Sequence, residues 1–281
     1  EKHNNFLANI SALTCSIKAF TGWTAIDSVA ESRKACGGNG FSKFALFGDI
    51  FEFVDIGQTA EGDHNVILLK ASSYLLHKTG EAQAAKFSDE ISMEFLKQSI
   101  DEKSGTKYSP KCLKSQVDLF ADKANYFCHQ TLKEFKALTN KKVNATEYLH
   151  PTLFKKMCQS HYEFFVVKSY VRFLESFTDE NTRKVFEDVL RLYVAYRIYK
   201  EAEYFRSVLG SDEFDEVPNT IISLCKSLRN EVILLTDSLP YPDKVMGVWG
   251  AKDMDGYARF LGLVRSVPGV SERPAYWKKI S

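Results

Sequence analysis

The sequence predicts an all-α fold, with a helical bundle domain followed by a second helical domain. Only 7 prolines and 15 glycines occur in 281 residues, and long segments carry apolar residues at the three-and-four spacing of a helix face. Hydrophobic residues make up 44% of the chain and aromatic residues 13%, which is ample for one or two packed cores and argues against disorder. We therefore expect helices throughout and almost no room for strands.

The first 80 residues are expected to hold three helices. One long helix covers residues 5–35, with a weak point near Thr21-Gly22. A short helix over residues 42–49 follows a glycine-rich turn, and an apolar helix covers residues 65–76. The apolar positions of the long helix follow the three-and-four spacing expected of a buried stripe: Phe6, Ile10, Leu13, Ile17 and Phe20.

A domain boundary is expected near residue 80, because residues 77–85 turn small and polar. It divides the chain into domains over residues 1–80 and 81–281. Beyond it, the apolar spacing predicts four long helices, over residues 116–138, 151–177, 181–209 and 218–238.

Start and stop signals support the last three of these helices. Pro151 suits a first helical turn. Asp179 or Asn181 can cap the third helix, and Gly210 can close it. Pro240 and Pro242 end the fourth. A shorter helix is expected over residues 257–264, and no repeat with a period of 20 to 50 residues is visible.

Charge and cysteine usage exclude several classes of function. Lys plus Arg (37) nearly balances Asp plus Glu (36), so no overall field attracts nucleic acid or an anionic membrane. No run of about 18 apolar residues predicts a membrane span. The six cysteines form no CxxC pair and lack histidines at metal-ligand spacing, so we expect no metal and interpret them as free, mostly buried thiols of a reducing compartment.

Four residues, Gly37, Gly38, Asn39 and Gly40, form a glycine-rich turn after the first helix. Glycines permit positive φ and close approach of a ligand to the backbone, and exposed amides can bind phosphate. The turn is not a dinucleotide fingerprint, because no strand precedes it. Taken alone, simple helix termination explains it best.

Glu61 is the second candidate and lies 24 positions after Gly37, on a turn that enters the apolar helix. In a partly desolvated pocket a carboxylate has its pKa raised toward neutrality and can act as a base on a carbon acid. The alternative is a helix-start carboxylate favoured by the helix dipole, with Asp63 sharing that role. Taken alone, this structural alternative is favoured.

Two segments together resemble a known family. KAFTGWTAIDSVAESRKACGGNGF, which ends at Phe41, is followed by TAEGDHNVILLKASSYLL. They closely resemble the carboxyl-terminal flavin domain of the acyl-CoA oxidases, peroxisomal relatives of the acyl-CoA dehydrogenases. The resemblance continues weakly through SLRNEVILLTDSL and DGYARFL, which look like the extra helical domain of oxidases.

The resemblance implies a flavoenzyme of fatty acid β-oxidation. Glu61 is then the base that removes the proton next to the thioester carbonyl of a fatty acyl-CoA, and the product is a trans-2-enoyl-CoA. A hydride passes to FAD, and in oxidases oxygen is reduced to hydrogen peroxide. The resemblance implies a homodimer and assigns FAD contacts to Gly37, Gly38, Asn39, Gly40, Gly62, Asp63 and Asn65.

This sequence departs from the family pattern at several points. Ala60 precedes the base, where oxidases usually carry an aromatic residue, and GGNGF replaces the common GGHGY, as dehydrogenases often do. The family's amino-terminal helical domain and middle β domain have no counterpart in these 281 residues, so we expect a fragment or processed subunit that is inactive alone. The KKIS tail is not an SKL-type signal, so a peroxisomal location is implied by resemblance only.

Two other functions remain open at this point. One is an acyl-CoA dehydrogenase that passes its electrons to a carrier protein. The other is a non-catalytic helical scaffold descended from an oxidase, which Ala60 and the missing domains favour. Acyl chain length is not readable from this sequence.

Overall fold

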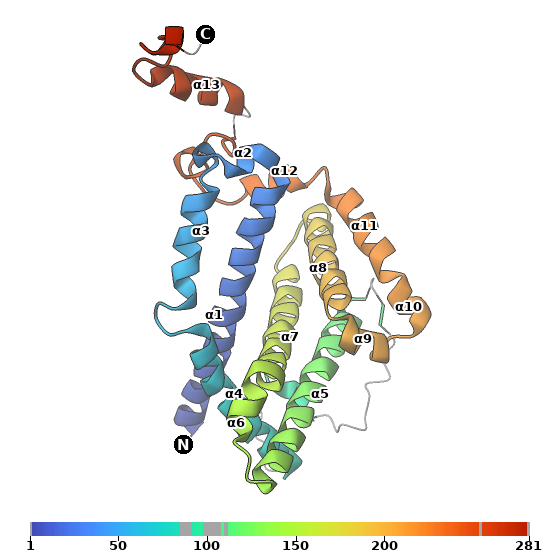
Figure 1. The fold of residues 1–281 in the computed structure, drawn as a ribbon. Helices are drawn as coiled ribbons and strands as arrows, with labels where there is room; N and C mark the ends of the chain where they lie inside the picture. Colours follow the sequence, from blue (N-terminus) through green and yellow to red (C-terminus); the bar gives the residue numbers. More distant parts are fainter. Residues whose placement is uncertain (1, 85–91, 98–107, 110–111, 253–254, 280–281) are drawn as a thin grey trace. The chain divides into compact units, whose positions relative to one another are not determined.

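The structure is a computed structural model that describes residues 2–84, 92–97, 108–109, 112–252 and 255–279. Helices dominate this part of the chain, and the described residues include no strand (Figure 1). The all-α prediction is therefore confirmed. Of the predicted features, residue 85 of the boundary segment and the last two residues of the KKIS tail lie outside the described ranges.

The chain divides into two compact units. The first comprises Glu1–Thr21 and Gln58–Val232, and the second Gly22–Gly57 and Ile233–Ser281. The two units are defined by spatial compactness, whereas the boundary near residue 80 was predicted from composition. The domains over residues 1–80 and 81–281 therefore stay a prediction.

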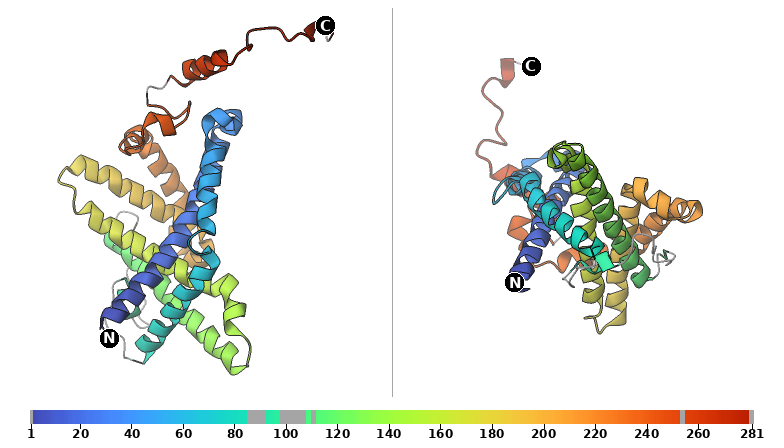
Figure 2. Two further views of the ribbon diagram at one scale, coloured as in Figure 1. Left: turned by 90° about the vertical axis from the view of Figure 1, so that its left-hand side faces the viewer. Right: turned by 90° about the horizontal axis from the view of Figure 1, so that it is seen from below.

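Helix α1 (Lys2–Ala35) is one continuous helix, as predicted, but the predicted buried stripe is wrong at Phe6 and Ile10, which are 46% and 37% exposed. Figure 2 shows it unbroken in dark blue. Its first part belongs to the first unit, and the division falls at Thr21 and Gly22, where the sequence indicated a weak point. Ala12 and Ala19 are 2% and 0% exposed, so small side chains on one face let α1 pack closely.

The rest of the first unit is built from helices that continue from the Glu61 turn. They are α4 (His64–Gln83), η3 (Glu94–Lys97), α5 (Leu113–Asn140), α6 (Ala145–Leu149), η4 (His150–Phe154), α7 (Lys155–Leu174), α8 (Glu180–Lys200), α9 (Ala202–Val208), α10 (Ser211–Asp215) and α11 (Val217–Leu228). Helices α5 and α7 lie side by side at its centre, and α8 packs on α11 (Figure 1).

Residues spaced by four form the buried face of α5. Phe120, Ala124 and Cys128 are all 0% exposed, as are Met157 and Cys158 of the facing α7. This is the stripe that helical periodicity predicts for a core helix. Only two of the six cysteines are buried, whereas three are exposed, so the prediction of free thiols is confirmed and that of mostly buried ones is wrong.

The second unit holds the remainder of α1 together with short elements. These are α2 (Gly37–Phe41), η1 (Lys43–Ala45), α3 (Phe47–Asp55), α12 (Val232–Asp237, beginning one residue before the unit does), η5 (Asp243–Val245), α13 (Gly256–Ser266) and η6 (Trp277–Lys279). The two halves of this unit meet where Val248 N–H donates to the carbonyl of Phe44 at 3.1 Å. The ring of Phe44 also lies edge-on to Phe260, with centroids 5.2 Å apart.

The structure corrects the two short helix predictions in the first 80 residues. Residues 42–49 do not form one helix, because Leu46 adopts a left-handed conformation, with φ of +60°, between η1 and α3. The apolar helix α4 extends past Leu76 to Gln83. Gly80 does not end it, since the surrounding Ala, Gln, Lys and Glu residues favour helix and Thr79 is fully buried.

The structure also corrects three longer helices. A π-helical turn over His150–Phe154 precedes α7, because Pro151 lacks an amide hydrogen and disturbs the regular bonding. The predicted helix over residues 181–209 breaks at Glu201. Residues 218–238 form two helices, and the second ends at Asp237, before the prolines as expected.

Candidate functional site

Glu61 lies in the short turn that leads into α4. Its backbone is left-handed, with φ of +56°, and Gly62 follows with φ of +105°. Glycine is required at position 62 for a second reason, because an added Cβ would lie 2.8 Å from Cγ2 of Ile67. Glu61 is exposed, so the turn presents its side chain at the surface of the described chain.

Asp63 starts helix α4. Its Oδ1 accepts the amide hydrogens of Asn65 at 2.9 Å and Val66 at 3.2 Å, which satisfies two amides that the helix itself leaves unpaired. The helix-start role, which was the structural alternative for Glu61, thus belongs to Asp63. Glu61 takes no part in the capping of α4.

Two side chains outside the predicted set of site residues bind the backbone of residues 60–65. Lys18 Nζ of α1 donates to the carbonyl of Ala60 at 2.9 Å and to that of Gly62 at 2.7 Å. His150 Nε2 lies 2.9 Å from the carbonyl of Asn65. These contacts join residues that are 42 to 85 positions apart in the sequence, so no local sequence pattern predicts them.

The glycine segment forms helix α2, and its glycines serve different needs. Gly37 has φ of +57° where α1 ends, which glycine adopts without strain. A Cβ on Gly37 or Gly38 would meet nothing within 4 Å, whereas one on Gly40 would lie 2.1 Å from the carbonyl oxygen of Arg33. Gly40 therefore serves packing, and the backbone of the first two glycines is open to an approaching group.

The predicted site residues thus fall into two sets. Glu61, Gly62, Asp63 and Asn65 lie within five consecutive positions of the first unit, and the structure brings Lys18 to this segment. The glycine segment Gly37–Phe41 belongs to the second unit. Each set is described within its own unit, and their union in one site stays a prediction.

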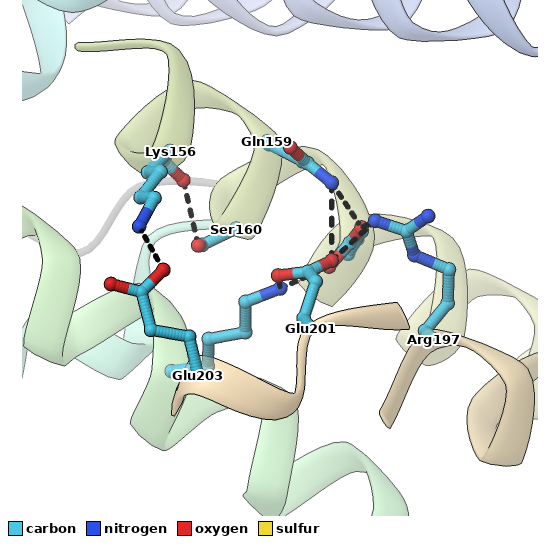
Figure 3. A network of polar contacts seen from close by, with 8 residues as sticks. Lys156, Gln159, Ser160, Arg197, Glu201 and Glu203 are labelled. Atoms are coloured by element: carbon cyan, nitrogen blue, oxygen red, sulfur yellow. Dashed lines mark hydrogen bonds and ion pairs between the residues drawn. The ribbon is translucent and has the colours of Figure 1, made fainter. Parts of the chain in front are cut away.

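A separate group of charges joins α5, α7 and the break between α8 and α9 (Figure 3). Lys123 Nζ lies 2.6 Å from Glu163 Oε2 and also pairs with Glu201. Arg197 pairs with the same two carboxylates, and Gln159 Nε2 donates to both, at 3.0 and 3.1 Å. Two cations and two anions therefore balance in the interior.

Burial and pairing set the ionisation of these carboxylates. Burial disfavours the charged form of Glu163, yet Lys123 and Arg197 hold its pKa below the usual range. Burial and the adjacent Glu163 raise the pKa of Glu201. Because every carboxylate of the group has a cation partner, we interpret it as a structural network that fixes the break at Glu201, not as a catalytic site.

The second unit contains a cavity of about 560 Å³ between the η1 segment and α13. Lys43, Asp243 and Arg259 contribute its charged groups, and its other lining includes Phe44 and Leu263. Arg259 lies 3.9 Å from Asp243, so these two charges partly balance. The described residues include no group of three or more His, Cys, Asp or Glu fit to hold a metal ion.

Within the described ranges, no helix combines the length and apolar character needed to cross a bilayer.

Comparison with known families gives two adjacent matches. The profile of the family described as acyl-CoA oxidase matches residues 112–281, and that of the acyl-CoA oxidase C-alpha1 domain matches residues 1–76. Together they include the glycine segment, Glu61 and most of the helices beyond it.

Individual relatives agree with these matches. The chain is 26% identical to an acyl-coenzyme A oxidase of Candida glabrata, over 92% of this chain and 36% of the relative. It is also 26% identical to human peroxisomal acyl-coenzyme A oxidase 3, over 97% of this chain and 41% of the relative. The chain thus spans about two fifths of the length of these relatives.

Solved structures show the same fold. Acyl-CoA oxidase 3 from Yarrowia lipolytica superposes with a TM-score of 0.85 at 22% identity, covering 95% of this chain and 40% of that one. Acyl-CoA oxidase-2 of Caenorhabditis elegans, bound with FAD, ascaroside-CoA and ATP, gives 0.86 at 20% identity, covering 97% and 41%.

Proposed function

The chain belongs to the acyl-CoA oxidase family, and from this premise we propose that it is the carboxyl-terminal portion of an FAD-dependent acyl-CoA oxidase. The reaction converts a fatty acyl-CoA to the trans-2-enoyl-CoA and reduces oxygen to hydrogen peroxide. One observation carries the proposal: the family match includes a carboxylate, Glu61, that a left-handed turn presents at the surface, clear of the capping of α4.

Glu61 is proposed as the base. It takes the proton from the carbon next to the thioester carbonyl, while the adjacent β carbon loses a hydride and the double bond forms between the two carbons. FAD, when bound, supplies the hydride acceptor and passes the two electrons to oxygen. Because a base of this kind works best in a partly desolvated site, we expect other parts of the oxidase to cover the exposed turn.

The residues present fit a flavin at two places. Gly37 and Gly38 are exposed, and a Cβ on either would meet nothing within 4 Å, so with Asn39 they would hold part of FAD. Gly40 supports them by its close packing on α1. Gly62 and Asn65 follow the base in the sequence and are exposed, whereas Asp63 contributes by holding the start of α4.

Partners and location follow from the same family membership. The proposed partners are a fatty acyl-CoA, oxygen and a second copy of the protein, together with the amino-terminal helical and β domains that complete an oxidase. A peroxisomal location is proposed because relatives such as the human one are named peroxisomal.

The test is an assay of the full-length protein with acyl-CoA under air. An oxidase releases about one hydrogen peroxide for each enoyl-CoA formed, without an added electron carrier. Turnover that depends on a carrier and releases no peroxide would instead favour a dehydrogenase. A colourless protein that takes up no FAD would favour the non-catalytic scaffold.

A further inference from the structure

We propose that Lys18 is a positioning residue for the base, a clamp that holds the Glu61 turn by both of its flanking carbonyls. The inference rests on the proposed function of Glu61 and adds a residue to it. The ammonium of Lys18 donates to the carbonyl just before Glu61 and to the carbonyl of Gly62 just after it, at 2.9 and 2.7 Å.

The conformation of the turn explains why a clamp is needed. Glu61 has a Cβ yet lies at φ of +56°, and Gly62 continues at φ of +105°. A side-chain-bearing residue adopts the left-handed region only where its surroundings hold it there. The two hydrogen bonds restrain the peptide group before Glu61 and the one after Gly62, and the two residues with positive φ lie between these groups.

The other end of the clamp is anchored in the core. Lys18 precedes Ala19 and Phe20 on α1, which are 0% and 7% exposed. Phe20 stacks on Tyr162 of α7, with ring centroids 5.5 Å apart. The packing of α1 on α7 therefore fixes the backbone from which the Lys18 side chain reaches the turn.

The clamp sets the direction of the Glu61 side chain and does not take part in substrate binding. A misplacement of about 1 Å in a catalytic group can lower turnover about 10²-fold. Loss of Lys18 should therefore lower kcat with little change in KM for acyl-CoA. A charge-preserving arginine, which still offers donors to both carbonyls, should restore part of the loss.

The test compares Lys18→Met, Lys18→Gln and Lys18→Arg in the full-length holoenzyme, with Lys133→Met at an exposed position of α5 as the matched control. We expect a kcat about 10- to 100-fold lower for Lys18→Met, an unchanged KM, intermediate values for the other two variants, and wild-type values for the control. Hydrogen exchange should become several-fold faster at the amides of residues 60–62 in Lys18→Met.

Hydrogen exchange is measured without substrate, so it tests the clamp even if the wild-type protein is inactive with acyl-CoA. Such inactivity would contradict the proposed function and not the clamp. If Lys18→Met does not fold, Lys18→Gln carries both readouts. Wild-type kcat in the variants, or a loss of kcat with unaltered exchange at residues 60–62, would overturn the inference.

Discussion

At the scale of single residues, the Glu61 turn combines two properties. Its backbone is held in a conformation that residues with a Cβ seldom adopt, while its side chain is exposed. Strain of this kind persists at functional sites when the surrounding structure supports it. Here Lys18 and the capping of α4 by Asp63 provide that support.

Another residue, His161, should make stability depend on pH. The ring is fully buried, with Nε2 3.0 Å from Ser92 Oγ. Burial lowers its pKa to about 4, and contacts with Ser92 and Glu94 only partly oppose this. Between pH 6.5 and 4 this histidine is therefore protonated in the unfolded chain but neutral in the folded chain. The free energy of unfolding thus falls as pH falls through that window.

We expect this histidine to remove about 2 kcal/mol of stability between pH 8 and pH 5. Urea unfolding of His161→Gln should lack that part of the decline, with pH 8 as the common baseline. An equal decline in the variant and the wild type would contradict the assignment.

At the scale of elements, the start of α4 depends on Asp63. Removing its two backbone hydrogen bonds with Asp63→Ala should lower the free energy of unfolding by about 1 kcal/mol, whereas Asp63→Asn, which can still cap, should lose much less. Urea unfolding measures both. If the two variants are equally stable, the cap is not what holds this helix end.

The break between α8 and α9 depends on the buried charge network. Lys123 has no exposed side-chain surface, so Lys123→Met leaves Glu163 and Glu201 with one cation between them. We expect a loss of about 3 to 5 kcal/mol in urea unfolding.

Adding Glu201→Gln to Lys123→Met restores the balance of charge and should recover part of that loss. No difference between the single and the double variant would show that the charges are not coupled.

Helix type and order were predictable from sequence, but several ends were not. Apolar spacing located α1, α5 and α13, because their patterns are local. The break at Glu201 was missed because it depends on Lys123 and Glu163, 78 and 38 positions earlier in the sequence. Contacts across such distances leave no periodic signal.

The candidate site shows the same division. Glu61 and the glycine segment were singled out by their spacing and by family resemblance. The left-handed φ of Glu61 could not be predicted, because a sequence indicates that conformation mainly through glycine. Lys18 was missed too, since only the fold brings it to the turn.

At the scale of the whole molecule, the chain spans about two fifths of its relatives. It supplies the proposed base on one compact unit and the glycine segment on the other. A complete active site on this account needs the remaining domains of an oxidase, and the exposed positions of Glu61 and Gly38 are where those domains and FAD should meet this chain.

The most direct test of the central claim is the turnover of Glu61→Gln in the full-length holoenzyme. Turnover is measured as the rate of oxygen uptake with a fatty acyl-CoA as substrate. We expect kcat to fall about 10²- to 10⁴-fold while FAD stays bound, and Glu134→Gln, at an exposed position of α5, to keep wild-type turnover. Turnover of Glu61→Gln within threefold of wild type would contradict the assignment of Glu61 as the base.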